Sequence, residues 1–150
     1  MAAEYVAPTE QSVNLNSPVI LDASIPCRKG YIYHEDGTGI LILRGITNNC
    51  FAQYQINFVA NIAVPTGGAV TPIAVSIVEN GEPKPASTSI ITPAAVETFN
   101  SVSCTGIIKV PRGCCFTVAI EYVSGVTDGT TTPTPTILVR NSNLTVNRIA

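Results

Sequence analysis

Cysteine offers the widest chemistry in this 150-residue chain, which has five cysteines and a single histidine. The cysteines are Cys27, Cys50, Cys104, Cys114 and Cys115. Their number is odd and no C-x-x-C spacing occurs, so the pattern predicts neither a disulfide framework nor a zinc site. Cys114 and Cys115 are neighbours in an expected strand, where their side chains point to opposite faces and do not pair with each other. We therefore expect thiols that pack as small buried apolar groups.

No other cluster of residues has the composition of a catalytic or ligand site. Nucleophilic catalysis would need a thiol or hydroxyl beside His34, which stands in the turn-like sequence His-Glu-Asp-Gly. Residues 66–68 (Thr-Gly-Gly) follow an expected strand but open no helix, so they do not predict a phosphate site. Asp22, Asp36 and Asp128 are isolated in the sequence, unlike calcium ligands. We expect no enzyme activity, no cofactor and no metal.

The chain is unusually poor in charge. Charged residues make up 12% and hydrophobic residues 45% of it, against about 25% charged in an ordinary soluble domain. With a net charge of −2 and no basic patch, nucleic acid is not an expected partner. No apolar run approaches the length of about 18 residues that a membrane span needs, so no membrane contact is expected either. We interpret the low charge as a surface covered by other subunits; a neutral surface of Thr, Ser, Asn and Gln is the alternative.

Residues 98–123 organise the expected fold. They predict two long strands joined by a tight turn at 110–113 (Val-Pro-Arg-Gly), with Pro111 and Gly113 shaping the turn. In the second strand Phe116 and Val118 begin one apolar face, and Cys115 and Thr117 the other face. This alternation with period two is typical of a half-buried strand, and we predict that the two strands form a hairpin.

The rest of the chain predicts further strands and little helix. Residues 51–64 show the longest alternation, with an apolar face and an uncharged face of amides. Shorter strands are expected at 18–23, 31–33, 39–44, 70–79, 87–92 and 137–149, and one helical turn at 92–96. Eight to ten strands with turns rich in Gly and Pro predict an all-β, antiparallel two-sheet jelly-roll sandwich. The chain has no tryptophan, which argues against an immunoglobulin-type domain.

We divide the chain into an N-terminal arm, 1–17, and a jelly-roll domain, 18–150. The arm is polar and irregular, with a short alternating piece that is also compatible with a first edge strand. Its apolar residues are expected to contact a capsid or a neighbouring protomer: Tyr5, Val6, Val13 and Leu15. On this hypothesis, deletion of residues 1–16 leaves the assembly folded and abolishes its attachment. The first residues lack a secretory signal, so the protein is expected to stay in the cytoplasm unless a particle carries it out.

Several segments in this order resemble small jelly-roll proteins of tailed-bacteriophage virions. They are GILILRG at 39–45, NIAVPTGG at 61–68, a strand closing on Asn-Gly-Glu, TPAAV at 92–96 and VPRGCCFTVAIE at 110–121. The chain is also similar to the wider trimeric class of tumour-necrosis-factor-like and complement-type globular heads. The resemblance implies a homotrimer that decorates a capsid or forms a fibre head. The short segment before the domain favours a compact decoration protein.

The expected function is therefore structural: a trimeric capsid decoration protein of the phage head, made in the host cytoplasm and located on the virion. Its expected partners are itself and the major capsid protein or another virion protein. The alternatives are a fibre tip that binds a host surface glycan and a lectin-like or carbohydrate-active domain. The predicted trimer interface is the amide face of 51–64, namely Gln53, Gln55, Asn57, Val59 and Asn61. The predicted exposed tip comprises Asn80, Glu82, Lys84 and Asp128.

Overall fold

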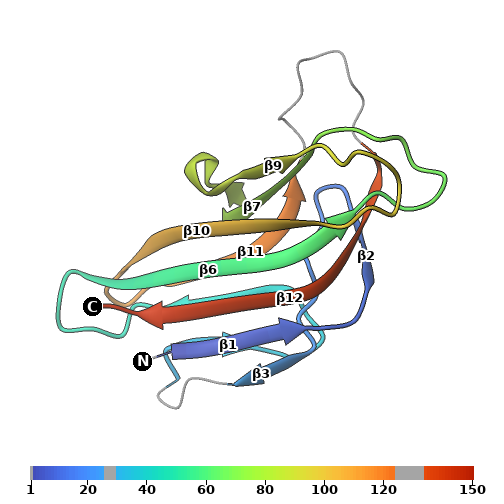
Figure 1. The fold of residues 1–150 in the computed structure, drawn as a ribbon. Coiled ribbons are helices and arrows are strands. Elements are labelled where there is room, and N and C mark those ends of the chain that lie inside the picture. The colour runs from blue at the N-terminus through green and yellow to red at the C-terminus, as the bar shows by residue number, and fades with distance from the viewer. Residues whose placement is uncertain (1, 26–29, 124–133) are drawn as a thin grey trace.

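The computed structural model describes residues 2–25, 30–123 and 134–150, and it shows two antiparallel sheets packed face to face (Figure 1). The first sheet has the strand order β10-β6-β12-β1-β3, with β2 beside β12. Its strands are β1 (Ala2–Ala7), β2 (Gln11–Asn14), β3 (Ala23–Ile25), β6 (Phe51–Ala63), β10 (Asn100–Pro111) and β12 (Thr136–Arg148). The all-β, two-sheet prediction is confirmed.

The second sheet has the order β4-β5-β11-β7-β8, with β9 beside β7. Its strands are β4 (Ile32–His34), β5 (Ile40–Arg44), β7 (Ile73–Glu79), β8 (Glu82–Pro83), β9 (Ser89–Ile91) and β11 (Cys115–Val123). A single turn of 3-10 helix, η1 (Pro85–Ser87), lies between β8 and β9. Among the described residues, no helix is both long and apolar enough to cross a membrane.

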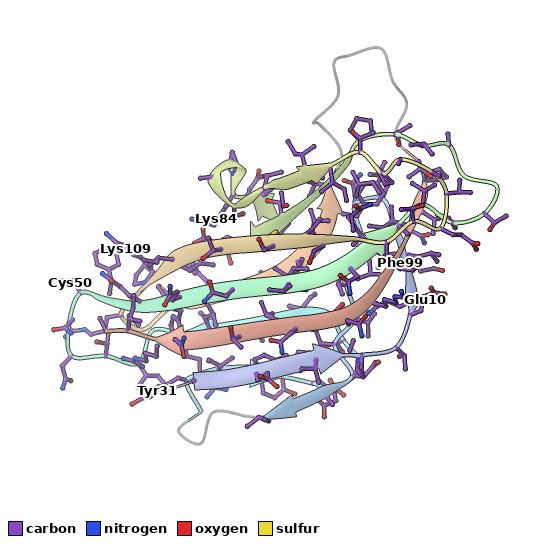
Figure 2. All side chains as sticks on the ribbon, viewed as in Figure 1. Glu10, Tyr31, Cys50, Lys84, Phe99 and Lys109 are labelled. Carbon is purple, nitrogen blue, oxygen red and sulfur yellow. The ribbon has the colours of Figure 1, made fainter. Side chains whose placement is uncertain are left out.

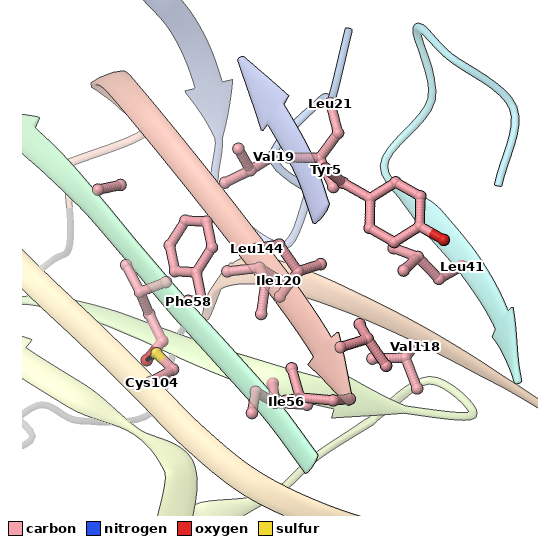
Figure 3. Packing of buried hydrophobic residues seen from close by; sticks show 14 of the residues in the cluster. Tyr5, Val19, Leu21, Leu41, Ile56, Phe58, Cys104, Val118, Ile120 and Leu144 are labelled. Atoms are coloured by element: carbon pink, nitrogen blue, oxygen red, sulfur yellow. Dashed lines mark hydrogen bonds between the residues drawn. The ribbon is translucent and has the colours of Figure 1, made fainter. Parts of the chain in front are cut away.

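The core fills the space between the two sheets. Along β6 every second side chain points inward, and Tyr54, Ile56 and Phe58 are at most 1% exposed. Figure 3 shows Ile56 and Phe58 of the first sheet together with Val118 and Ile120 of the second. The buried Tyr54 hydroxyl donates to the carbonyls of Tyr31 and Arg44, so its polar end is satisfied. The alternation of residues 51–64 was therefore assigned to the correct faces.

The two strands predicted around residues 110–113 exist, but they do not form a hairpin. β10 pairs with β6 along its whole length, and β11 pairs with β5 and β7 in the other sheet. The turn carries the chain across the sandwich, with Gly113 at φ 81° and the Cys114 amide bonded to the Pro111 carbonyl at 3.0 Å. Both strands turn an apolar face to the same core. A period-two pattern reports that face but does not say whether two strands pair or oppose each other.

The corner is tightly packed against the loop after β5. A Cβ atom on Gly45 would lie 2.1 Å from the Pro111 carbonyl oxygen, so only glycine fits there. The Gly45 amide donates to the Cys114 carbonyl, and the Gly113 amide donates to the Gly45 carbonyl. These reciprocal bonds fix the corner as a rigid structural element.

The prediction of a separate N-terminal arm is wrong for the described residues. β1 lies inside the first sheet, paired with β12 on one side and β3 on the other. Tyr5 and Val13 are each only 2% exposed, because Ala3, Tyr5 and Ala7 alternate toward the core as in any half-buried strand. Tyr5 and Val13 therefore do not contact a capsid or a neighbouring protomer. Val6 and Leu15 are half-buried at the edge of this packing.

Two shorter predictions also differ from the structure. The expected strand at 18–23 is reduced to single bridges at Pro18 and Leu21, with β3 beginning at Ala23. The expected helical turn at 92–96 is absent, since these residues form no helix. The one helical turn of the described chain is η1, where Pro85 supplies the restricted φ that starts it.

Candidate self-association face

The outer face of the first sheet, turned away from the core, is the most distinctive surface of the molecule. Strand register places three rows of four outward side chains across β10, β6, β12 and β1. The rows are Ser103–Val59–Asn143–Val6, Thr105–Asn57–Thr145–Glu4 and Ile107–Gln55–Asn147–Ala2. We call these twelve positions the amide-rich face. Glu4 is their single charged residue, which makes this a broad and nearly uncharged surface.

The amide-rich face combines accessible apolar groups with ordered polar ones. Val59 is 49% exposed and Ile107 is 50% exposed. The Thr105 hydroxyl donates to the Asn57 side-chain oxygen at 2.8 Å, and the Asn61 amide donates to the Asn141 side-chain oxygen at 3.1 Å. Within the face, Thr105 and Asn57 are thus paired before any partner arrives, and Asn61 and Asn141 are paired next to it. These hydrogen bonds reduce the cost of covering the four side chains.

All five residues predicted for the trimer interface lie on this side of the sheet. Asn57, Gln55 and Val59 belong to the rows themselves. Gln53 lies beside Lys109 and Asn61 beside Arg140, at the two ends where charge reappears. Sequence reasoning missed the contributions of β10 and β12, although their alternation with Ser, Thr and Asn was a usable signal. To recognise that these strands form one face requires the register of their pairing, which the sequence does not show.

The predicted tip residues lie on the β7–β8 turn, apart from Asp128, which falls outside the described residues. The Asn80 side chain accepts a hydrogen bond from the Thr117 amide at 2.9 Å, so it fastens the turn to β11. Lys84 and Glu79 approach to 3.5 Å. Glu82 is exposed. Two of these three tip residues are therefore engaged within the molecule, and they do not converge on a common site.

Among the four cysteines that the structure describes, the expectation of buried thiols is correct for Cys104 alone. Cys104 is 3% exposed and donates to the Val75 carbonyl at 3.3 Å, and burial raises the pKa of its thiol to about 11. Cys50, Cys114 and Cys115 are exposed, because they lie at the corner and at the strand start next to it, where the core ends. Figure 2 shows Cys50 at this end of the sandwich, near Lys109. Cys27 lies outside the described residues.

Alkylation of the native protein should therefore separate the cysteines. At about pH 8, iodoacetamide is expected to modify Cys50, Cys114 and Cys115 and to leave Cys104 unmodified until the protein unfolds, because the thiolate is the reactive form. Peptide mass spectrometry measures each site. Modification of Cys104 at the rate of Cys50 in native protein would contradict its burial.

The same pKa shift gives a pH dependence. Burial raises the pKa of Cys104 from the ordinary thiol value of 9.0 to about 11 in the folded protein. The unfolded chain therefore loses this proton first as pH rises, and the thiol's contribution is present below about pH 9 and is lost toward about pH 11, by about 2.7 kcal/mol at most. Comparison of Cys104→Ala with the unaltered protein isolates this part of the alkaline loss of stability.

A polar cavity of about 410 Å³ lies at the corner end of the sandwich. Its lining includes Tyr31, Thr47, Asn48, Asn49 and Arg148. The Arg148 guanidinium stacks 4.0 Å from the Tyr31 ring centre and donates to the carbonyls of Ile46 and Ala150. Its Nη1 atom is buried and has no hydrogen-bond partner in the described chain. Hydroxyl and amide groups beside an aromatic ring suit a sugar better than an apolar ligand.

No protein-family model matches the chain, and no curated protein matches it. Solved structures do. The globular domain of zebrafish complement 1qA protein aligns with a TM-score of 0.66 at 11% identity, over 99% of this chain and 97% of that one. The tumour necrosis factor Eiger from S. frugiperda aligns with a TM-score of 0.63 at 11% identity, over 100% of this chain and 92% of that one. The fold is the jelly roll of tumour necrosis factors and complement globular heads.

Murine APRIL shares this jelly roll, with a TM-score of 0.59 at 11% identity over 99% of this chain and 98% of that one. The predicted fold class is thereby confirmed in its architecture. At this identity the likeness concerns the fold, and no residue of these proteins transfers a role to this jelly roll. Function has to be argued from the surfaces described above.

Proposed function

We propose that this jelly roll is a non-enzymatic structural protein that assembles as a homotrimer and decorates the capsid of a tailed bacteriophage. The observation that carries the proposal is the amide-rich face, which presents accessible Val59 and Ile107 with Glu4 as its single charge. A second copy of the chain is the partner that such a surface fits best, because two nearly uncharged faces meet without leaving a charge unpaired.

The extent of the face supports a stable assembly. It covers four neighbouring strands, including the two 12- and 13-residue strands β10 and β6. A standard interface buries about 800 Å² on each partner, so we expect the interface to extend beyond the twelve positions along the same strands. A rotation that closes on itself uses every copy of the face and leaves none exposed, which accounts for a low overall charge without filament growth.

Placement on a virion is the finer part of the proposal. It rests on the resemblance of the turn and strand motifs at 61–68 and 110–121 to phage jelly-roll proteins. The major capsid protein is then the partner that the assembled trimer covers.

Light scattering coupled to size exclusion tests the assembly. The expected mass is three times the chain mass of 15.7 kDa, at concentrations of about 1 μM and above, as for a specific interface of standard size. A monomer across this range would overturn self-association. Attachment is tested separately by sedimenting purified phage heads with the protein. A trimer that stays in the supernatant would retain the assembly and overturn the capsid role.

Glycan binding is the second candidate, and the cavity beside Tyr31 and Arg148 favours it. A fibre tip that recognises a host surface sugar would use this polar cavity in place of the β7–β8 turn. A glycan array discriminates the two roles. Selective retention of one sugar class, lost in Asn49→Ala, would favour a receptor-binding tip, and an array without retained sugars would exclude it.

A further inference from the structure

The outer face of the second sheet contains a hollow with an unusual combination of walls. Ile40, Ala119 and Val78 lie directly opposite one another on β5, β11 and β7. The central residue is the smallest of the three, so the surface dips over Ala119 between two branched side chains. The hollow measures about 160 Å³, close to the size of one amino-acid side chain, and Gly81 and Thr117 complete its lining.

A carboxylate stands at the rim of this apolar hollow. Glu121 follows Ala119 by two residues on β11 and therefore lies on the same outer face, opposite Ser76. Burial raises the pKa of its carboxyl. Within the described residues, Glu121 takes part in no ion pair and no side-chain hydrogen bond. A partly desolvated carboxylate without a partner is costly, and a cation is the group that relieves the cost.

We propose that this hollow, which we call the Ala119 hollow, binds the side chain of a lysine presented by a partner polypeptide. The four-carbon stem lies along Ile40, Ala119 and Val78, and the ammonium group pairs with Glu121. A lysine side chain is one of the two natural groups that join an aliphatic stem to a cationic end. The compact ammonium pairs with one carboxylate and leaves its other donors to water at the rim, whereas an arginine fork has five donors to satisfy.

The described lysines of this chain do not fill its own hollow. Lys84 approaches Glu79 at 3.5 Å. Lys109 projects from the outer face of the first sheet, on the opposite side of the sandwich. Lys29, the third lysine, lies outside the described residues. The hollow also remains accessible when the amide-rich face is covered, so this inference does not depend on the self-association proposed above.

A titration with lysine analogues tests the site in the intact protein. Nα-acetyl-lysine methylamide is added, and the backbone amide shifts of Val78, Ala119 and Glu121 are followed by NMR. Saturable shifts centred on these residues are expected. The norleucine analogue keeps the stem and lacks the ammonium, and it should bind about three- to fivefold more weakly, as expected for a partly exposed ion pair.

Two variants and a matched control complete the test. Glu121→Gln retains the shape and should make the lysine and norleucine analogues bind equally. Ala119→Leu fills the hollow and should abolish the shifts with both. Glu10→Gln removes an exposed carboxylate between β1 and β2, on the other sheet, and should change nothing. Because Glu121→Gln alters no packing, it remains informative even if Ala119→Leu fails to fold.

Four outcomes would overturn the proposal. They are the absence of saturable shifts, equal binding of the two analogues to the unaltered protein, tighter binding of the matching arginine analogue, and a lysine preference that survives in Glu121→Gln. A fifth outcome concerns the occupant. If folded Ala119→Leu has a lower oligomeric mass than the unaltered protein, the hollow receives a second copy of this chain, and the partner assignment is wrong.

Discussion

Removal of residues 1–16 is expected to abolish the native fold. The deletion takes β1 and β2 out of the first sheet and leaves β12 and β3 without their shared neighbour. It also removes Tyr5 and Val13 from the core, where each is 2% exposed. The free energy lost with two buried side chains and a full strand ladder exceeds the free energy of unfolding of a typical domain, about 5–15 kcal/mol. Thermal unfolding monitored by circular dichroism measures the result.

Single substitutions in β1 refine this prediction. Tyr5→Ala should lower the free energy of unfolding by about 3–5 kcal/mol, since it empties a core position. The Tyr5 ring also packs against the His34 ring, with 4.8 Å between the ring centres. Val6→Ala, at the next position, is the matched control. Its side chain points outward and is half-buried, so a loss of about 1 kcal/mol or less is expected. A folded, fully stable deletion variant would show that β1 is dispensable and would restore the interpretation as an arm.

Val59→Glu should dissociate the assembly while leaving the protomer folded. Val59 lies in an end row of the amide-rich face between Ser103 and Asn143, and its 49% exposure means that the core does not depend on it. A carboxylate buried there in every copy meets no cation among the twelve positions of the face. An unpaired buried charge costs about 3 kcal/mol or more, which weakens association at least about 100-fold.

Light scattering across a dilution series measures this effect, with Ile90→Glu as the control. Ile90 is a similarly exposed branched residue, at 51%, but it belongs to β9 of the second sheet. Ile90→Glu should retain the mass of the unaltered protein. If Val59→Glu keeps that mass and Ile90→Glu loses it, the interface lies on the second sheet and the amide-rich face is free.

The sequence predicted those features that depend on local pattern. The faces of β6 followed from the alternation of residues 51–64, and Asn80-Gly81 correctly marked the turn into β8, where both residues have positive φ. The sequence alone did not predict which distant strands pair with each other. The partners of β10 and β11 are set by which apolar faces meet across the core, and many pairings satisfy the same alternation.

The candidate surfaces show the same limit. Gln55, Asn57 and Val59 were recognisable on one strand, but the rows that join them to β10, β12 and β1 needed strand register. The Ala119 hollow could not be predicted for the same reason, because Ile40, Ala119 and Val78 come from three different strands. The prediction of buried thiols failed for a different reason. Cysteine is a residue type common in protein cores, but Cys114 and Cys115 are exposed because they lie at the corner between β10 and β11, beyond the end of the core.

The position of β12 in the first sheet also governs when the protein can fold. β12 occupies residues 136–148 and is the strand that joins β6 to β1. During translation β1 emerges early, and its main neighbour is made only near the end of the 150 residues. The growing chain therefore carries unsatisfied edges on β6 and β1 until residues 136–148 have been made, and the first sheet closes only after them. Ribosome-bound chains that stop before residue 136 should accordingly depend on chaperones to stay soluble.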